Sequence, residues 1–249
     1  MKLVVNADDF GYSKGVNLGI LEAHVEGIVS SATMMMNMPG VAHAFRLAAD
    51  TPTLGVGVHL VLTCGSPLEA NVPTLTDENG MFRRGQAHLE DVSAEEVERE
   101  FTAQLETFFR SGRKPTHIDS HHHVHARETI LPVVLRLAER HGLPVRYPWA
   151  FEQAAERSHT TKVHTTEGFS HHFYGADLTA DGLIAIIEGL SGSATAEIMT
   201  HPAYVDEELL KGSSYAIPRA RELQILTAPK VKEYIKLKKV QLVNFNEIG

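Results

Sequence analysis

Short apolar segments alternate with longer amphipathic ones along almost the whole chain, and this alternation restricts the fold more than any other feature. The N-terminal segment KLVVNA is a β-branched run of the kind found in a buried strand. Helices are predicted where apolar residues recur at helical spacing behind capping residues such as Ser13, Ser93 and Thr179. Strands that alternate with helices favour right-handed βαβ units and a parallel sheet. We therefore expect an α/β fold with strands at residues 2–7, 28–36, 54–62, 115–120, 144–147, 196–200 and 240–245.

Parallel strands in this number can form either an open doubly wound sheet or a closed barrel. The first strand–helix turn contains neither GxGxxG nor GxxxxGK[ST], so a dinucleotide-binding or P-loop fold lacks its main support. We therefore predict a (β/α) barrel in a single domain over residues 1–249. Two irregular stretches, residues 65–90 and 151–177, interrupt the pattern, and a connection as long as the first is typically functional or mobile.

The composition excludes several classes of protein. The chain has 23 Lys and Arg against 31 Asp and Glu, a net charge of −8 with His neutral, which argues against a nucleic-acid partner. Cys64 is the only cysteine, so a secreted disulfide scaffold is excluded. The N-terminal apolar run is too short for a signal peptide, and no segment approaches the roughly 18–20 apolar residues of a membrane span. We therefore expect a cytoplasmic protein without a membrane partner.

Polar groups able to do chemistry stand at, or just after, the carboxyl ends of four predicted strands. They are the pair Asp8-Asp9, then His59, the histidines at residues 121–125, and His201. In a βα barrel these strand ends converge on one face, where active sites are built. Residues far apart in the sequence are therefore expected to meet in one pocket.

Asp8 and Asp9 are adjacent, so on a regular strand their side chains would point to opposite faces. Where the chain turns they can divide two roles, with one carboxylate binding a metal and the other accepting a proton. Alone, such a pair more often caps a turn, but the nearby histidines favour the functional reading. His59, in an apolar strand, would by itself be taken as a core histidine, and Gly55 and Gly57 leave room for a close approach.

The segment THIDSHHHVH carries five histidines in nine positions, too many to be satisfied in a core. His121 and His125 share a face whether the segment continues as a strand or turns into a helix. Asp119 could fix the tautomer of a neighbouring imidazole. One aspartate with two or three histidines suits a divalent ion that activates water, and this donor set does not choose between Zn²⁺, Mn²⁺, Co²⁺ and Mg²⁺.

Two further segments supply candidate residues. His201 follows a strand, precedes Pro202, and would be the natural general acid of a metal hydrolase. The segment SSYAIPRARELQIL either binds a polar substrate or forms a solvated helix face. We expect Tyr215 and Arg221 of this segment to bind the substrate.

The segments NADDFG, GVHLVLT, KPTHIDSHHHVH and THPAYVD, in this order, resemble the YdjC-like carbohydrate deacetylase family. The resemblance implies a distorted TIM-like barrel, a divalent site of the Mg²⁺ type, and a homodimer. It also implies that one aspartate of the pair, His59 and His121 bind the metal, with His125 as a fourth ligand. By analogy with the wider polysaccharide deacetylases, Asp8 would be the base and Asp9 the ligand.

The activity implied by this resemblance is hydrolysis of N-acetyl groups on small amino sugars or chito-oligosaccharides, with release of acetate. Asp8 and His201 would be the catalytic residues, and residues 65–90 and 151–177 would be substrate-facing insertions. Two alternatives stay open. One is a metal-dependent hydrolase of another small molecule, a phosphoester or an amide, and the other is a non-catalytic sugar- or metal-binding barrel.

Overall fold

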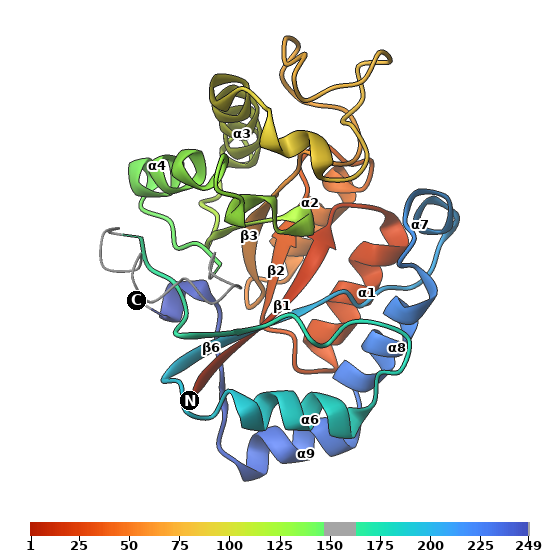
Figure 1. Cartoon of the computed structure of the whole chain (residues 1–249). Helices are drawn as coiled ribbons and strands as arrows, with labels where there is room; N and C mark the ends of the chain where they lie inside the picture. Colours follow the sequence, from red (N-terminus) through yellow and green to blue (C-terminus); the bar gives the residue numbers. More distant parts are fainter. Residues whose placement is uncertain (147–162, 249) are drawn as a thin grey trace.

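A single parallel sheet organises the computed structural model, which describes residues 1–146 and 163–248. Its strand order is β4-β3-β2-β1-β6-β5, and β7 pairs with β1 outside this path (Figure 1). The described strands are β1 (Lys2–Phe10), β2 (Ser31–Met34), β3 (Gly55–Leu60), β4 (Ile118–Ser120), β5 (Gly168–Ser170), β6 (Thr195–Thr200) and β7 (Gln241–Leu242).

Helices cover the outside of the curved sheet (Figure 1). The side chains of Ser13, Ser93 and Thr179 each accept a backbone N–H bond at a helix start, which confirms the predicted caps. The longer helices are α1 (Lys14–Val25), α2 (Val41–Asp50), α3 (Ala94–Phe109), α4 (Leu131–His141), α6 (Ala180–Gly189), α8 (Ile217–Leu226) and α9 (Pro229–Leu237), and α7 (Glu207–Gly212) is short.

The sheet curls into a half-barrel and does not close, so the α/β prediction is confirmed and the closed barrel is not formed among the described residues. The predicted strand at 144–147 contributes only one parallel bridge, from Val145 to Ile118 of β4. Val145 also donates its N–H to the carbonyl of His164, 2.9 Å away, before β5 begins. β5 itself lies inside the stretch that was predicted to be irregular. The curvature is consistent with a distorted TIM-like barrel.

The central strand β1 explains how the strand ends come together. Eight of its nine residues are buried, because helices and neighbouring strands cover both faces. Its register with β6 pairs Ala7 with Thr200, which brings the next residues, Asp8 and His201, to the same edge. On the other side, β3 and β4 pair His59 with Asp119. The predicted convergence of strand ends is therefore produced by register.

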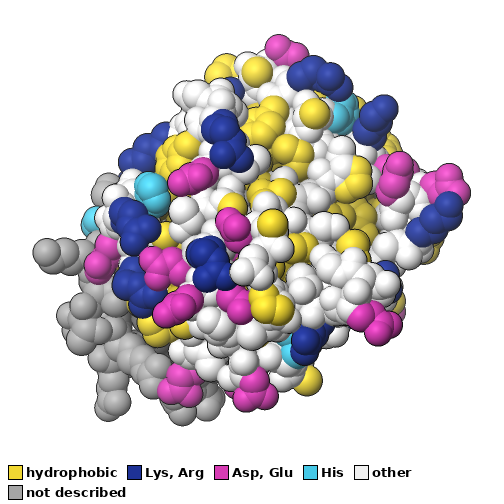
Figure 2. All heavy atoms as spheres, turned by 90° about the horizontal axis from the view of Figure 1, so that it is seen from above, with side chains coloured by type: hydrophobic (Ala, Val, Ile, Leu, Met, Phe, Trp, Pro, Cys, Tyr) yellow, Lys and Arg dark blue, Asp and Glu magenta, His cyan; other side chains and the backbone are white. Residues whose placement is uncertain are grey.

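The surface carries charges of both signs. In the view from above, acidic and basic side chains are interspersed, and no continuous basic area is visible on that face among the described residues (Figure 2). No helix in the described part of the chain has the length and apolar character needed to cross a membrane.

Gly19 of α1 allows that helix to pack directly on the backbone that follows β6. A Cβ atom at position 19 would lie 2.4 Å from the Cα of Ala203. We therefore expect Gly19→Ala to lower the free energy of unfolding by about 1–3 kcal/mol through overpacking, measured by urea denaturation. The matched control is Gly189→Ala at the end of α6, where a Cβ would meet nothing within 4 Å. Equal stability of the two variants would contradict this packing analysis.

Candidate active site

The end of β1 turns sharply at Asp9, whose φ of 67° is in the left-handed region. Few residues other than Gly adopt this conformation, although Asp and Asn do so more readily than most. The turn removes the alternation of a regular strand, so the carboxylates of Asp8 and Asp9 both line one cleft. This is the kind of turn at which one of two adjacent carboxylates can bind a metal while the other accepts a proton.

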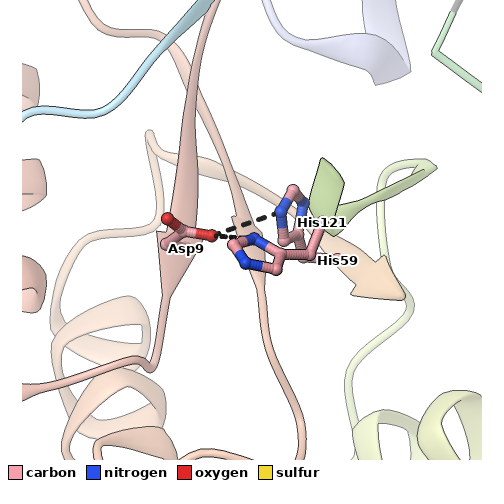
Figure 3. A group of neighbouring side chains, drawn as sticks. All are labelled: Asp9, His59 and His121. Carbon is pink, nitrogen blue, oxygen red and sulfur yellow. Dashed lines mark hydrogen bonds and ion pairs between the residues drawn. The ribbon is translucent and has the colours of Figure 1, made fainter. Parts of the chain in front are cut away.

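Asp9, His59 and His121 form a compact group at the floor of this cleft (Figure 3). Oδ1 of Asp9 lies 3.3 Å from Nε2 of His59 and 2.9 Å from Nδ1 of His121. The other oxygen of Asp9, Oδ2, accepts a 2.6 Å hydrogen bond from Arg219. His59 is contributed by β3, and His121 begins the turn η2 (His121–Ala126) directly after β4.

The hydrogen bonds of His59 orient it for ligation. Its Nδ1 lies 2.7 Å from Asp119 Oδ1, which confirms that Asp119 holds an imidazole, and Thr33 Oγ1 is 3.1 Å away. Nε2 therefore faces Asp9. A carboxylate and two imidazoles whose ligand atoms lie within 4.8 Å of one another fit a divalent ion such as Zn²⁺, Mn²⁺, Co²⁺ or Mg²⁺. Burial lowers the pKa of His59, but the charges of Asp119 and Asp8 outweigh it and raise the pKa to about 10.

A second group, Asp8 with His59 and Asp119, has similar spacing, but a guanidinium already neutralises it. Arg146 is fully buried and donates to both oxygens of Asp8, at 2.8 and 2.6 Å. It also contacts Asp119 Oδ2 and Glu197 Oε1, each at 2.9 Å. Burial alone would raise the pKa of Asp8, but Arg146 holds it well below its usual range. Arg219 contacts Asp9 only through Oδ2, so the group of Asp9, His59 and His121 keeps Oδ1 of Asp9 available and is the better candidate for a further cation.

His201 lies near Asp8 and packs against two aromatic side chains. Its Nε2 is 3.9 Å from Asp8 Oδ2, and its Nδ1 is 3.8 Å from Glu222 Oε1. The rings of Tyr174 and Tyr215 stack at 3.9 Å and both present an edge-on geometry to the His201 ring. The expected general acid thus lies beside the expected base.

The cleft has a volume of about 1100 Å³ and is open to solvent. Both stretches predicted as insertions contribute to its lining, through Gly65, Asp77 and residues 81–86 of the first and through His171 and Tyr174 of the second. Residues 151–162 of the second stretch lie outside the described residues, so their place is left as predicted.

The structure does not bring His125 into the Asp9 group. Its ring is buried, and Nδ1 lies 2.5 Å from Ser120 Oγ. The expectation assumed a regular strand or helix, but η2 contains two residues with positive φ, His122 at 55° and His123 at 53°. These residues change the direction of the chain, so His121 and His125 do not share a face.

The structure also separates the two predicted substrate-binding residues. Tyr215 lines the cleft, whereas Arg221 is exposed and donates to the carbonyl of Leu178 and to Gln224. Residues two apart on a helix point in different directions, and it is Arg219 that reaches Asp9.

Sequence reasoning also missed Arg146 and Glu197, and gave Glu222 no definite role. An arginine inside the short apolar strand PVRY was the available signal for the first of these.

The fold and the site together define a parallel α/β half-barrel with a candidate divalent-metal centre at the carboxyl ends of its strands. The chain belongs to the YdjC-like protein family, whose model matches residues 2–237.

Relatives and solved structures agree with this assignment. Proteins named carbohydrate deacetylase in Brevibacillus brevis and Geobacillus stearothermophilus are 61% and 51% identical, covering 100% and 98% of this chain and 100% and 96% of their own. A solved structure from Enterococcus faecalis, provisionally named a cellobiose-phosphate cleavage protein, is 37% identical with a TM-score of 0.95, covering 100% of this chain and 98% of its own. A family 4 carbohydrate esterase from Streptomyces lividans, 11% identical with a TM-score of 0.52 over 97% of this chain and 91% of its own, is similar in fold alone.

Arg146 makes a testable contribution to stability. Arg146→Met leaves Asp8 and Asp119 as buried carboxylates without their cation, and we expect a loss of about 3–5 kcal/mol in the free energy of unfolding at pH 7. The loss should shrink as the pH falls toward 4, because the Asp8 carboxylate of the variant takes up a proton, whereas in the wild type Arg146 holds the pKa of Asp8 well below its usual range and keeps it ionised. Urea denaturation at several pH values measures both effects.

The control for this experiment is Arg136→Met, which removes a partly exposed arginine that pairs with Glu98 on the surface. We expect this change to cost less than about 1 kcal/mol. A pH-independent loss in Arg146→Met, or one no larger than the control, would show that Arg146 does not neutralise the site.

Proposed function

We propose that the protein is a metal-dependent carbohydrate deacetylase that removes N-acetyl groups from small amino sugars or chito-oligosaccharides and releases acetate. The names of the relatives from Brevibacillus brevis and Geobacillus stearothermophilus support the deacetylase activity. The observation that carries the proposed mechanism is the group of Asp9, His59 and His121 in an open cleft with Asp8 and His201 beside it.

In this proposal Asp9, His59 and His121 hold the divalent ion, and Mg²⁺ is the first choice because the family resemblance implies it. When bound, such an ion supplies polarisation of the acetyl carbonyl and a more acidic water. Asp119 and Thr33 keep Nε2 of His59 directed at the site, and Arg219 holds the second oxygen of Asp9.

The chain's own residues move the protons. Asp8 accepts a proton from the attacking water, and Arg146 keeps this carboxylate ionised at neutral pH. His201 gives a proton to the amide nitrogen as the bond between the acetyl carbon and nitrogen breaks. The hydroxyl of the water stays on the acetyl carbon, so the products are acetate and a free amino sugar.

The dimensions of the cleft support a sugar substrate larger than a single ring. Its volume of about 1100 Å³ exceeds the roughly 300–1,000 Å³ of most small-molecule sites. Tyr215 lines the cleft, and the half-exposed ring of Tyr174 stacks on it, which together offer an apolar wall beside His201.

The cytoplasmic location, the homodimer and the single-domain boundaries remain predictions.

The proposal is tested by measuring acetate release from N,N′-diacetylchitobiose. We expect turnover to be abolished by a chelator and restored by a divalent ion, because no described side chain of the cleft replaces the Lewis acid. His59→Ala should lower kcat/KM by at least about 10²-fold, since it removes a proposed ligand from a preorganised site.

The control variant is His141→Ala, which changes a histidine at the end of α4 that does not line the cleft. Its activity should equal that of the wild type. Turnover that survives both the chelator and His59→Ala would refute metal-dependent hydrolysis at this site.

A further inference from the structure

Helix α8 presents two buried charged side chains to the ends of two strands. Arg219 and Glu222 are three residues apart, so they lie on the same face of the helix, and both are buried. Arg219 reaches Asp9 at the end of β1, as described above. Glu222 reaches His201 at the end of β6, and the proposed function has so far given it no task.

Glu222 is held through both oxygens of its carboxylate. One oxygen, Oε2, accepts a short hydrogen bond from the backbone N–H of His201. The other, Oε1, accepts a 2.7 Å bond from the Tyr215 hydroxyl, which in turn accepts the backbone N–H of Gly175 at 3.0 Å. Glu222 therefore connects the end of β6, the start of α8 and the segment that carries Tyr174.

The ring of His201 lacks a firm partner of its own. Its Nδ1 is buried and makes no hydrogen bond within the described residues, and Glu222 Oε1 is its nearest carboxylate atom at 3.8 Å. Contacts between catalytic groups often tighten when a substrate binds. Tyr174 and Tyr215 limit the ring by their edge-on packing, with ring centres 5.6 and 5.8 Å away. The ring thus faces Glu222 with Nδ1 and Asp8 with Nε2.

We propose that Glu222 is a positioning residue that fixes the backbone and ring of His201, so that Nε2 is presented to the leaving nitrogen. This inference rests on the proposed function, in which His201 protonates the amine. A carboxylate oxygen beside Nδ1 can accept the proton of that nitrogen, which favours the ring orientation in which Nε2 faces the leaving nitrogen. Misplacement of a catalytic group by about 1 Å can cost about 10²-fold in rate.

The role predicts a dependence on the leaving group. Cleavage of an acetamide requires a proton on the departing nitrogen, whereas the 4-nitrophenolate of 4-nitrophenyl acetate leaves without one. We therefore expect Glu222→Gln to lower kcat for N,N′-diacetylchitobiose by about 10²-fold with KM little changed. Hydrolysis of 4-nitrophenyl acetate by the same preparation should change less than about threefold. The matched control is Glu233→Gln on the exposed face of α9, for which both rates should stay at the wild-type values.

A double-mutant cycle shows whether Glu222 acts through His201. In a His201→Ala background we expect Glu222→Gln to have no further effect on acetamide cleavage, because the group it positions is gone. Additive losses, or equal losses on the ester and the acetamide, would overturn the inference. If Glu222→Gln folds poorly, Glu222→Asp keeps the charge, shortens the side chain by one methylene, and should show the same selectivity.

A crystal structure of the Glu222→Gln or Glu222→Asp variant gives a readout that does not depend on turnover. We expect the His201 ring to leave its position near Asp8, with Asp9, His59 and His121 unmoved. A His201 ring in its wild-type position would overturn the inference even if the sugar proves to be the substrate. Failure of the wild-type enzyme to release acetate would instead refute the proposed function.

Discussion

The rest of the site depends on the ion pairs that the buried guanidinium of Arg146 makes with three carboxylates. Asp8, Asp119 and Glu197 all contact the guanidinium, and without a cation these buried carboxylates would repel one another at high cost. Burial, assisted by the charges of Asp119 and Asp8, raises the pKa of Glu197 to about 7 even beside this arginine. Arg146 binds both oxygens of Asp8, whereas Arg219 binds only Oδ2 of Asp9, so of the two Asp/His groups in the described part of the chain the one around Asp9 keeps a carboxylate oxygen that no guanidinium contacts.

The order and register of the parallel strands place the side chains of the site next to one another. β1 lies between β2 and β6, so its end is the centre from which side chains of neighbouring strands are reached. β3 and β4 pair His59 with Asp119 in register, and the proposed ligand His59 and its hydrogen-bond partner are therefore placed by paired strands. On the other side α8 contributes charged residues that contact both β1 and β6 at their ends. The proposed base and acid thus belong to one rigid framework.

The sequence shows the strand ends because apolar runs that stop at Asp8 and His201, or that carry His59 near their end, are local patterns. It does not show Arg146 or Glu222, because their importance comes from which other residues they contact across the sheet. Interpreting the histidine cluster as a regular element put His125 beside His121, and without the phase of the helix the sequence could not show that Arg219, and not Arg221, reaches Asp9. Side-chain direction around a turn or on a helix of unknown phase is therefore the part that the sequence alone could not settle.

Backbone strain accounts for the largest of these differences. Among the described residues other than Gly, four have positive φ, and three of them, Asp9, His122 and His123, lie in the site. Such conformations cost of order 1–3 kcal/mol each and persist where surrounding contacts hold them. Here the positive φ angles direct adjacent histidine side chains to different partners. His121 contacts Asp9, whereas His122 contacts Thr63 through Nδ1. The conformation of the histidine-rich turn thus depends on its contacts, and regular periodicity could not have shown which of its histidines, the proposed ligand His121, lies beside Asp9.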